Sequence, residues 1–225
     1  MILNTKLYPL LKNVSMLKLL VVIICVIQSC LLFGFEGNVQ LTRQSQYDTT
    51  YFIFYVKDAN VRVDEFSATG QLNKVLLVDL NTEKIVALSP ALKVYAHLGH
   101  KNEVQDKTRF DIIKTENFKV IEGKKCYQWR VRNRKLDCEV TYWVMETEDM
   151  IIQKLYRILD AAENYSSIPY YFNQIPQSSG FIPLIAIERN LVREQKQSMQ
   201  ITSINVKKVP SRLFEIPSDY KSLRI

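Results

Sequence analysis

The chain has 225 residues, 47% of them hydrophobic, and its 30 basic and 23 acidic residues give a formal net charge of +7 at pH 7. The first 34 residues supply three of those charges, so the remainder is only mildly basic. Such a surface is usually just solvated, although it also fits attraction to an anionic membrane. The basic residues that cluster near a predicted turn are Arg130, Arg132, Arg134 and Lys135. Because no nucleic-acid-binding motif is present, we predict no nucleic-acid partner.

The segment from Leu19 to Ile27 is an uncharged apolar run, preceded by Lys18 and followed by a polar break. A basic start, a short apolar run and a polar break are the three parts of a secretory signal. The run is shorter than the roughly 20 apolar residues that span a membrane. We therefore predict a signal peptide over residues 1–34 and a single exported domain over residues 35–225.

Two alternatives for the N-terminal segment stay open. The sequence Ile27-Gln28-Ser29-Cys30 resembles a lipobox, in which Cys30 would be lipidated. Gln28 is unusual in such a motif, and Leu31-Leu32-Phe33 follows where a polar tether is expected. In the other alternative, the segment is an uncleaved membrane anchor. A lipidated or anchored domain would stay at the membrane, whereas a cleaved one could diffuse.

Short segments with β-branched, aromatic or alternating apolar residues fill the first part of the domain. They predict strands at residues 38–42, 49–56, 61–66, 74–80, 84–88 and 93–98. Strands of this length with short polar turns are typical of an antiparallel meander. After a polar segment at 100–109, which we expect to be an exposed loop, further strands are predicted at 117–121, 125–132 and 137–145.

One helix is predicted late in the chain, because apolar residues recur at helical spacing from Ile151 to Leu159. Thr147, Glu148 and Asp149 precede it as a cap and as favourable negative charge, and the pattern fades near Asn164. We expect a loop at 166–180 and two last strands at 181–188 and 195–207. The predicted fold is therefore mainly β (α+β): a large curved antiparallel sheet with one or more covering helices.

The residues that usually carry catalysis or bind metal are scarce in this sequence. His97 and His100 are the only histidines, and residues three apart on a strand point to opposite faces. The sequence contains neither a nucleophile elbow around a serine nor a glycine-rich phosphate loop. We predict no catalytic residue, no metal site and no cofactor, and hence a protein that is not an enzyme.

Cys126 and Cys138 are the cysteines outside the N-terminal segment, and an oxidising compartment would permit a disulfide between them. They belong to two predicted strands of one hairpin, in which a turn of about three residues would place Cys138 opposite a residue near Arg130 and not opposite Cys126. Four residues of strand are roughly 13 Å, more than the ~6 Å Cα separation of a disulfide. A bulge or a longer loop would allow the bond, so both states stay open.

Several predicted strands are apolar on both faces, as at residues 51–56, 75–80 and 140–145. An antiparallel sheet with one face in water should alternate more cleanly. One explanation is a sheet that is covered on both sides. The other is a curved sheet whose concave face lines an apolar ligand cavity, with the helix covering it and the 166–180 loop acting as a lid.

Short segments along the chain carry a resemblance to a known group of proteins. They include Phe35-Glu36-Gly37, Leu77-Val78-Asp79, residues 121–126, residues 140–143 and residues 214–221. In these segments the chain resembles an uncharacterised family of bacterial envelope domains related to the LolA/LolB-like superfamily of lipoprotein carriers. The resemblance implies an unclosed β-barrel with helices at its mouth, acyl chains bound in an apolar cavity, no enzymatic activity, and a periplasmic or outer-membrane location.

Two functions follow as hypotheses. The first is a carrier-like domain that binds a lipid acyl chain or another apolar ligand, since each buried CH₂ would contribute about 0.8 kcal/mol. Its candidate lining residues, chosen as large apolar groups on elements expected to face the cavity, are Trp129, Trp143, Leu155 and Phe181. The second is an envelope interaction or sensor protein with a filled core, whose protein partner the sequence does not identify.

Overall fold

The computed structural model describes residues 35–99, 109–148, 150–162 and 167–223, with the side chain of Ala162 left out. Residues Phe35–Ile225 form one compact unit. The N-terminal predictions, Cys30 included, lie outside the described residues, as do His100 and nearly all of the predicted 100–109 loop. Within the described residues, no helix is long and apolar enough to cross a bilayer.

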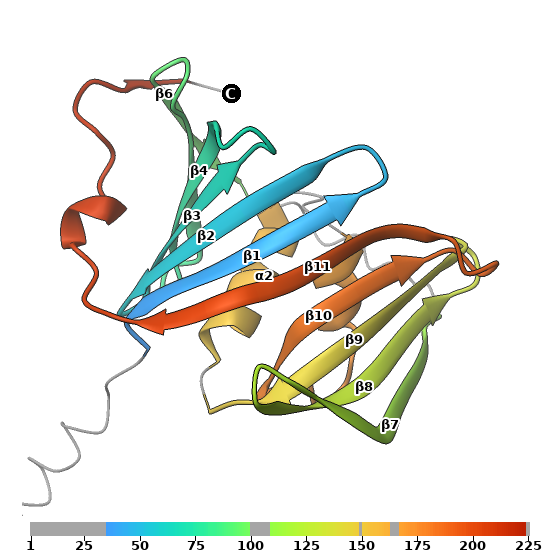
Figure 1. Cartoon of the computed structure of the whole chain (residues 1–225). Helices are drawn as coiled ribbons and strands as arrows, with labels where there is room; N and C mark the ends of the chain where they lie inside the picture. Colours follow the sequence, from blue (N-terminus) through green and yellow to red (C-terminus); the bar gives the residue numbers. More distant parts are fainter. Residues whose placement is uncertain (1–34, 100–108, 149, 163–166, 224–225) are drawn as a thin grey trace, which may run out of the picture. The chain divides into compact units, whose positions relative to one another are not determined.

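The described strands form one twelve-stranded sheet in the order β12-β6-β5-β4-β3-β2-β1-β11-β10-β9-β8-β7 (Figure 1). The strands are β1 (Gly37–Ser45), β2 (Thr49–Lys57), β3 (Asn60–Phe66), β4 (Leu72–Asp79), β5 (Lys84–Ser89), β6 (Val94–Leu98), β7 (Asp111–Ile121), β8 (Lys124–Asn133), β9 (Cys138–Glu146), β10 (Phe181–Arg189), β11 (Gln195–Val206) and β12 (Lys221–Ser222). Neighbouring strands are antiparallel except β12, which pairs with β6 in parallel. Because β1 pairs with both β2 and β11, it joins two meanders into one sheet.

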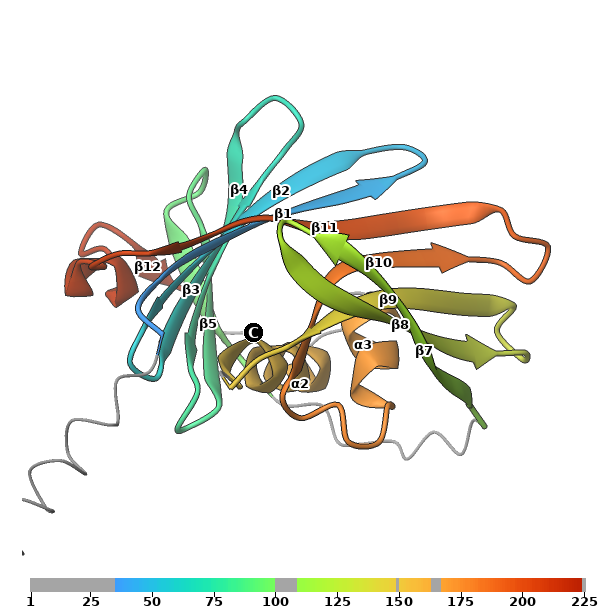
Figure 2. The ribbon, with the colours of Figure 1, turned by 60° about the horizontal axis from the view of Figure 1, so that its bottom comes forward.

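Two helices lie on the same side of this sheet, which arches over them (Figure 2). Helix α2 (Ile151–Ala162) buries one face, made of Ile152, Leu155, Tyr156, Ile158 and Leu159. Helix α3 is a single short helix, Ser167–Asn173. The predicted curved sheet with covering helices is therefore confirmed.

Helix α3 corrects the prediction of a loop over the whole of residues 166–180. Ile168, Tyr171 and Phe172 are buried at the i, i+3 and i+4 spacing of one helical face. Pro169 stands in the first turn, where its missing N–H costs no helical hydrogen bond. The prolines and the short length hid the helix in the sequence. The rest of the segment, Gln174–Gly180, connects α3 to β10 without regular structure.

Strand β7 begins six residues earlier than predicted, at Asp111 instead of Asn117. Its pairing with β8 shifts register between Lys114 and Phe118, so the residues between them leave the regular ladder. Most of β7 is exposed, because it is the last strand at one edge of the sheet. An irregular, largely polar edge strand lacks the alternation that reveals a strand in sequence.

The C-terminal segment explains the two apolar faces of β4. One face of β4 carries Leu76 and Val78 in the main core, and the other carries Val75 and Leu77. Ile216 and Tyr220 pack against the second set. The covering segment contains the 3₁₀ helix η1 (Ser211–Phe214) and β12, and its Leu213 carbonyl accepts a hydrogen bond of 3.1 Å from Arg62 Nη1. A sheet covered on both sides is thus the correct explanation for β4.

Candidate functional site

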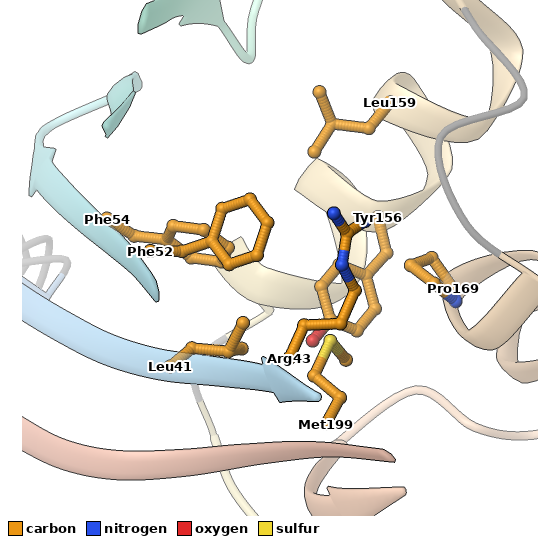
Figure 3. Close-up of a pocket in the computed structure, with 8 residues that line it drawn as sticks. All are labelled: Leu41, Arg43, Phe52, Phe54, Tyr156, Leu159, Pro169 and Met199. Carbon is orange, nitrogen blue, oxygen red and sulfur yellow. The ribbon is translucent and has the colours of Figure 1, made fainter. Parts of the chain in front are cut away.

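An apolar pocket lies between the concave face of the sheet and the two helices (Figure 3). Its lining residues are Leu41 and Arg43 from β1, Phe52 and Phe54 from β2, Tyr156 and Leu159 from α2, Pro169 from α3 and Met199 from β11. The cavity volume is about 20 Å³, which is room for one water-sized molecule. The pocket is therefore nearly filled by its own walls.

Strand pairing brings these side chains together. Leu41 is paired with Phe52 in the register of β1 and β2, and Arg43 is paired with Met199 in the register of β1 and β11. Side chains two apart on a strand share a face, so Arg43 follows Leu41 on the concave side. Tyr156 and Leu159 are three apart on α2 and project from one side of that helix.

Arg43 brings a positive charge to this apolar pocket. Its side chain is half-buried, with Nη2 donating a hydrogen bond of 3.2 Å to Thr50 Oγ1 and the guanidinium carbon 5.3 Å from the Phe52 ring centroid. Among the described residues, no carboxylate forms an ion pair with it. Because a guanidinium has five N–H donors, most of its donors stay available to an anionic or hydrogen-bond-accepting group.

Tyr156 contributes the second polar group. Its side chain is buried, and its hydroxyl has no hydrogen-bond partner among the described residues. Figure 3 shows the ring extending from α2 into the space between the helix and β1. Burial raises the pKa of this hydroxyl, so it stays neutral and can donate a hydrogen bond. Since an unsatisfied buried polar group costs about 1–3 kcal/mol, an acceptor placed beside this hydroxyl would be favourable.

The four predicted lining residues lie elsewhere in the structure, and none of them lines this pocket. Leu155 is fully buried on α2 in the main core. Trp129 of β8 and Phe181 of β10 pack against each other with ring centroids 4.7 Å apart. Trp143 is directed to the opposite face of β9 from the buried Tyr142, and Lys119 Nζ lies 4.2 Å from its ring centroid. The structure brings Trp129 and Phe181 together, away from Trp143.

The sequence predictions include neither Arg43 nor Tyr156, and only Arg43 has a sequence signal that could have revealed its position. Arg43 continues the alternation of Val39 and Leu41, so its place on the buried face was readable from the sequence. Tyr156 has no comparable signal, because a tyrosine on the apolar face of a helix usually finds a partner for its hydroxyl. That its hydroxyl has none is visible only in the folded structure.

A buried polar cluster holds the first turn of α3 against the sheet. The Glu188 carboxylate accepts hydrogen bonds from Ser167 Oγ and, at 2.6 Å, from Gln197 Nε2, while Cys138 Sγ lies 3.4 Å from its other oxygen. Tyr142 adds a hydrogen bond of 2.6 Å from its hydroxyl to the Ile168 carbonyl. These contacts fix α3 to the sheet. The side-chain hydrogen bonds of α2 run elsewhere: Asp160 bonds with Asn173 on α3, and Gln153 bonds with Ser178 in the segment after α3.

The cysteines do not form a disulfide in the structure, since both are free and buried. The turn between β8 and β9 lies later in the sequence than predicted, at residues 134–137, so Cys138 pairs with Asn133 and not with a residue near Arg130. Cys126 pairs with Met145. The seven residues that separate their positions along the hairpin correspond to roughly 23 Å. That distance rules out the bond in this register.

Both thiols are expected to resist alkylation in the folded protein. Burial raises the pKa of Cys126 and raises the pKa of Cys138 to about 11, so neither forms much thiolate at pH 8. In a Cys25→Ser/Cys30→Ser variant without reductant, a colorimetric thiol reagent should detect no fast-reacting thiol in buffer and two in denaturant. Detecting none in denaturant would show that the two cysteines are bonded after all.

Asp160 links α2 to α3 by accepting a hydrogen bond of 3.3 Å from Asn173 Nδ2. Burial raises the pKa of its carboxyl and outweighs the opposing effect of that hydrogen bond. A raised folded-state pKa means that the stabilising contribution is complete below the unfolded pKa and is lost as the pH rises through the folded value. Asp160→Asn should therefore be more stable than the natural protein at pH 7 and equal to it near pH 3, as measured by urea denaturation. A less stable variant at pH 7 would contradict this.

The described residues contain no group of three or more histidine, cysteine or acidic side chains arranged to hold a metal ion. The pocket itself has an almost wholly apolar lining, and two of its lining residues, Arg43 and Tyr156, carry hydrogen-bond donors. Such a combination suits an apolar chain ending in an acceptor. The absence of enzymatic activity stays a prediction.

Comparison with known proteins gives a family and a fold. The model of the family DUF4412, described as a domain of unknown function, matches residues 35–220. No curated protein matches the sequence. Among solved structures, an uncharacterised conserved protein from Thermus thermophilus has a TM-score of 0.53 at 8% identity, over 84% of this chain and 91% of that one. It therefore shares the fold.

Two further structures are less similar. MucB in its complex with MucA from Pseudomonas aeruginosa has a TM-score of 0.45 at 9% identity, over 84% of this chain and 58% of that chain. A domain described as an outer membrane lipoprotein-sorting protein, from Vibrio parahaemolyticus, has a TM-score of 0.30 at 8% identity, over 79% of this chain and 87% of that one. The pocket geometry, and not these two likenesses, carries the argument on function.

Proposed function

The chain belongs to the DUF4412 family, and from this premise we propose that it is a carrier-like domain that binds a lipid acyl chain or another apolar ligand with a hydrogen-bond-accepting end. We propose further that it is not an enzyme and that it works in the periplasm or at the outer membrane. In this proposal residues 1–34 direct export, as a cleaved signal, a lipoprotein leader with Cys30, or an anchor.

One observation carries the proposal: Tyr156, whose buried hydroxyl has no partner among the described residues, lines the same apolar pocket as Arg43. A core that only had to be stable would gain from phenylalanine at this position. A ligand whose accepting end meets both the Tyr156 hydroxyl and the Arg43 guanidinium, and whose chain contacts Phe52, Leu159 and Met199, would satisfy both polar groups.

The pocket has to widen before an acyl chain can enter, since its volume is about 20 Å³. Helix α2 is the element that would move, because among the described residues its side-chain hydrogen bonds run to Asn173 on α3 and to Ser178, and none runs to a strand. Apolar side-chain packing holds α2 against the sheet. An acyl chain can replace these contacts, because each CH₂ that it buries contributes about 0.8 kcal/mol of binding free energy.

The test is a titration of the full chain with a fluorescent fatty acid and with the corresponding fatty alcohol. We expect saturable binding of both, tighter for the acid because Arg43 is positive. Leu159→Trp places a larger side chain in the pocket and should weaken binding by roughly tenfold or more. The larger side chain overpacks the core, which should destabilise the protein but leave it folded. Leu191→Trp, at an exposed position in the turn between β10 and β11, is the matched control and should bind as the natural chain does.

The second candidate function is an interaction or sensor domain with a filled core, and the small cavity volume favours it. In that case the fatty acid would show no saturable binding, and Leu159→Trp and Leu191→Trp would behave alike. Either result would reject the carrier proposal and leave the surface of the domain as its functional part.

A further inference from the structure

The positive charge of this protein is concentrated in one hairpin. Residues 109–135, which contain β7 and β8, hold nine basic and three acidic residues. The rest of residues 35–225 holds 18 basic and 20 acidic residues, so it is slightly negative. The hairpin alone therefore accounts for the basic character of the domain.

The end of the hairpin that carries the turn also exposes large apolar side chains. Phe118 is 57% exposed and Val120 is 66% exposed. They lie two apart on β7 and share a face with their register partners Tyr127 and Lys125. Strand β7 is the last strand of the sheet, so this apolar face borders solvent at the edge of the molecule (Figure 1).

Three lysines lie at the same end of the hairpin without forming ion pairs. Lys125 Nζ lies 4.5 Å from the ring centroid of Phe118, and Lys119 on the other face of β7 lies against Trp143. Lys124 is exposed beside them. Among the described residues, no carboxylate lies within 4.0 Å of any of the three ammonium groups.

The other end of the hairpin differs in this respect. Arg132 forms an ion pair of 2.5 Å with Glu139, and Arg134 forms one of 2.9 Å with Asp111. The basic cluster singled out in the sequence, around Arg130 to Lys135, is thus partly neutralised. At residues 118–125, by contrast, three lysines without ion pairs among the described residues lie beside two exposed apolar side chains.

We propose that residues 118–125, the tip of the β7–β8 hairpin, dock onto an anionic phospholipid surface. Phe118 and Val120 insert between the headgroups, where aromatic and aliphatic side chains leave water. Lys119, Lys124 and Lys125 contact the headgroup phosphates, and the negative potential of the surface attracts them. This surface is separate from the pocket under α2 and acts whether or not the pocket binds a ligand.

The test uses the full chain and vesicles of phosphatidylglycerol and phosphatidylcholine in equal parts, with pure phosphatidylcholine vesicles as reference. Hydrogen exchange, followed by mass spectrometry of the peptide that contains residues 118–125, reports contact at the tip itself, independently of any contribution from the N-terminal segment. We expect slower exchange of this peptide with the anionic vesicles only, and recovery of fast exchange at high salt.

Two matched pairs of variants test the charge and the apolar contact. Lys124→Glu/Lys125→Glu should weaken the partition of the chain onto anionic vesicles by roughly tenfold or more, whereas Lys207→Glu/Lys208→Glu, at two exposed lysines after β11, should not. Phe118→Ser/Val120→Ser should remove the exchange protection, whereas Val206→Ser should keep it. Equal effects of a variant and its control, or equal protection by both kinds of vesicle, would overturn the proposal.

Discussion

Replacing Phe172 with alanine should lower the free energy of unfolding by about 3–5 kcal/mol, the range for a large aromatic side chain removed from a packed core. Phe172 is fully buried on α3. Its ring centroid lies 5.2 Å from that of Tyr142 on β9 and 6.5 Å from that of Tyr156 on α2, so one side chain joins both helices to the sheet. The cavity left by its removal would undermine the pocket as well as the fold.

Urea denaturation followed by circular dichroism measures this effect as a lower transition midpoint with an unchanged slope. Phe118→Ala is the matched control, because the same atoms are removed from a side chain that is 57% exposed, and its effect should stay within about 0.5 kcal/mol. If Phe172→Ala lost no more than the control, the helices would not be anchored through this residue.

Replacing Tyr156 with phenylalanine should raise stability and weaken ligand binding at the same time. The change removes a buried hydroxyl that has no partner among the described residues, so the folded state should gain about 1 kcal/mol. The lost hydrogen bond to the ligand should reduce affinity for the fluorescent fatty acid by roughly three- to tenfold. A gain in stability together with a loss of affinity is the result expected of a hydroxyl that serves ligand binding.

Tyr142→Phe is the control for this prediction. Its hydroxyl is also buried, but it donates a hydrogen bond of 2.6 Å to the Ile168 carbonyl. Removing it should cost about 1 kcal/mol of stability, because the carbonyl is left without that donor, and should not change the contacts of the ligand. If Tyr156→Phe also lowered stability, the Tyr156 hydroxyl would have a partner in solution, and the main support for the pocket would be lost.

The sheet was largely readable from the sequence, because strands such as β2 and β4 are dense in β-branched and aromatic residues between polar turns. The predicted relation to an uncharacterised family and the predicted architecture of a curved sheet with covering helices are confirmed. What the sequence concealed were weak local patterns: α3, the irregular first half of β7, and the two-residue β12, whose pairing depends on the fold of the C-terminal segment.

The residues that line the pocket were harder to predict than the fold. Trp129, Trp143, Leu155 and Phe181 were chosen because they are large and apolar, but size does not tell which face of a strand a residue occupies or which other side chains fill the space beside it. Trp143 and the buried Tyr142 point to opposite faces of β9. An error of one residue in the assumed alternation therefore exchanges the faces to which they are assigned. Arg43 and Tyr156 matter through a charge and a hydroxyl inside an apolar enclosure, which only tertiary packing creates.

The central claim is that the space under α2 holds an apolar chain with an accepting end. Mass spectrometry of lipids extracted from the purified full chain tests it most directly. The account predicts acyl lipids in near-stoichiometric amounts with the natural protein and with Leu191→Trp, and several-fold less with Leu159→Trp. Equal amounts of lipid in all three proteins, or none in the natural protein, would contradict it.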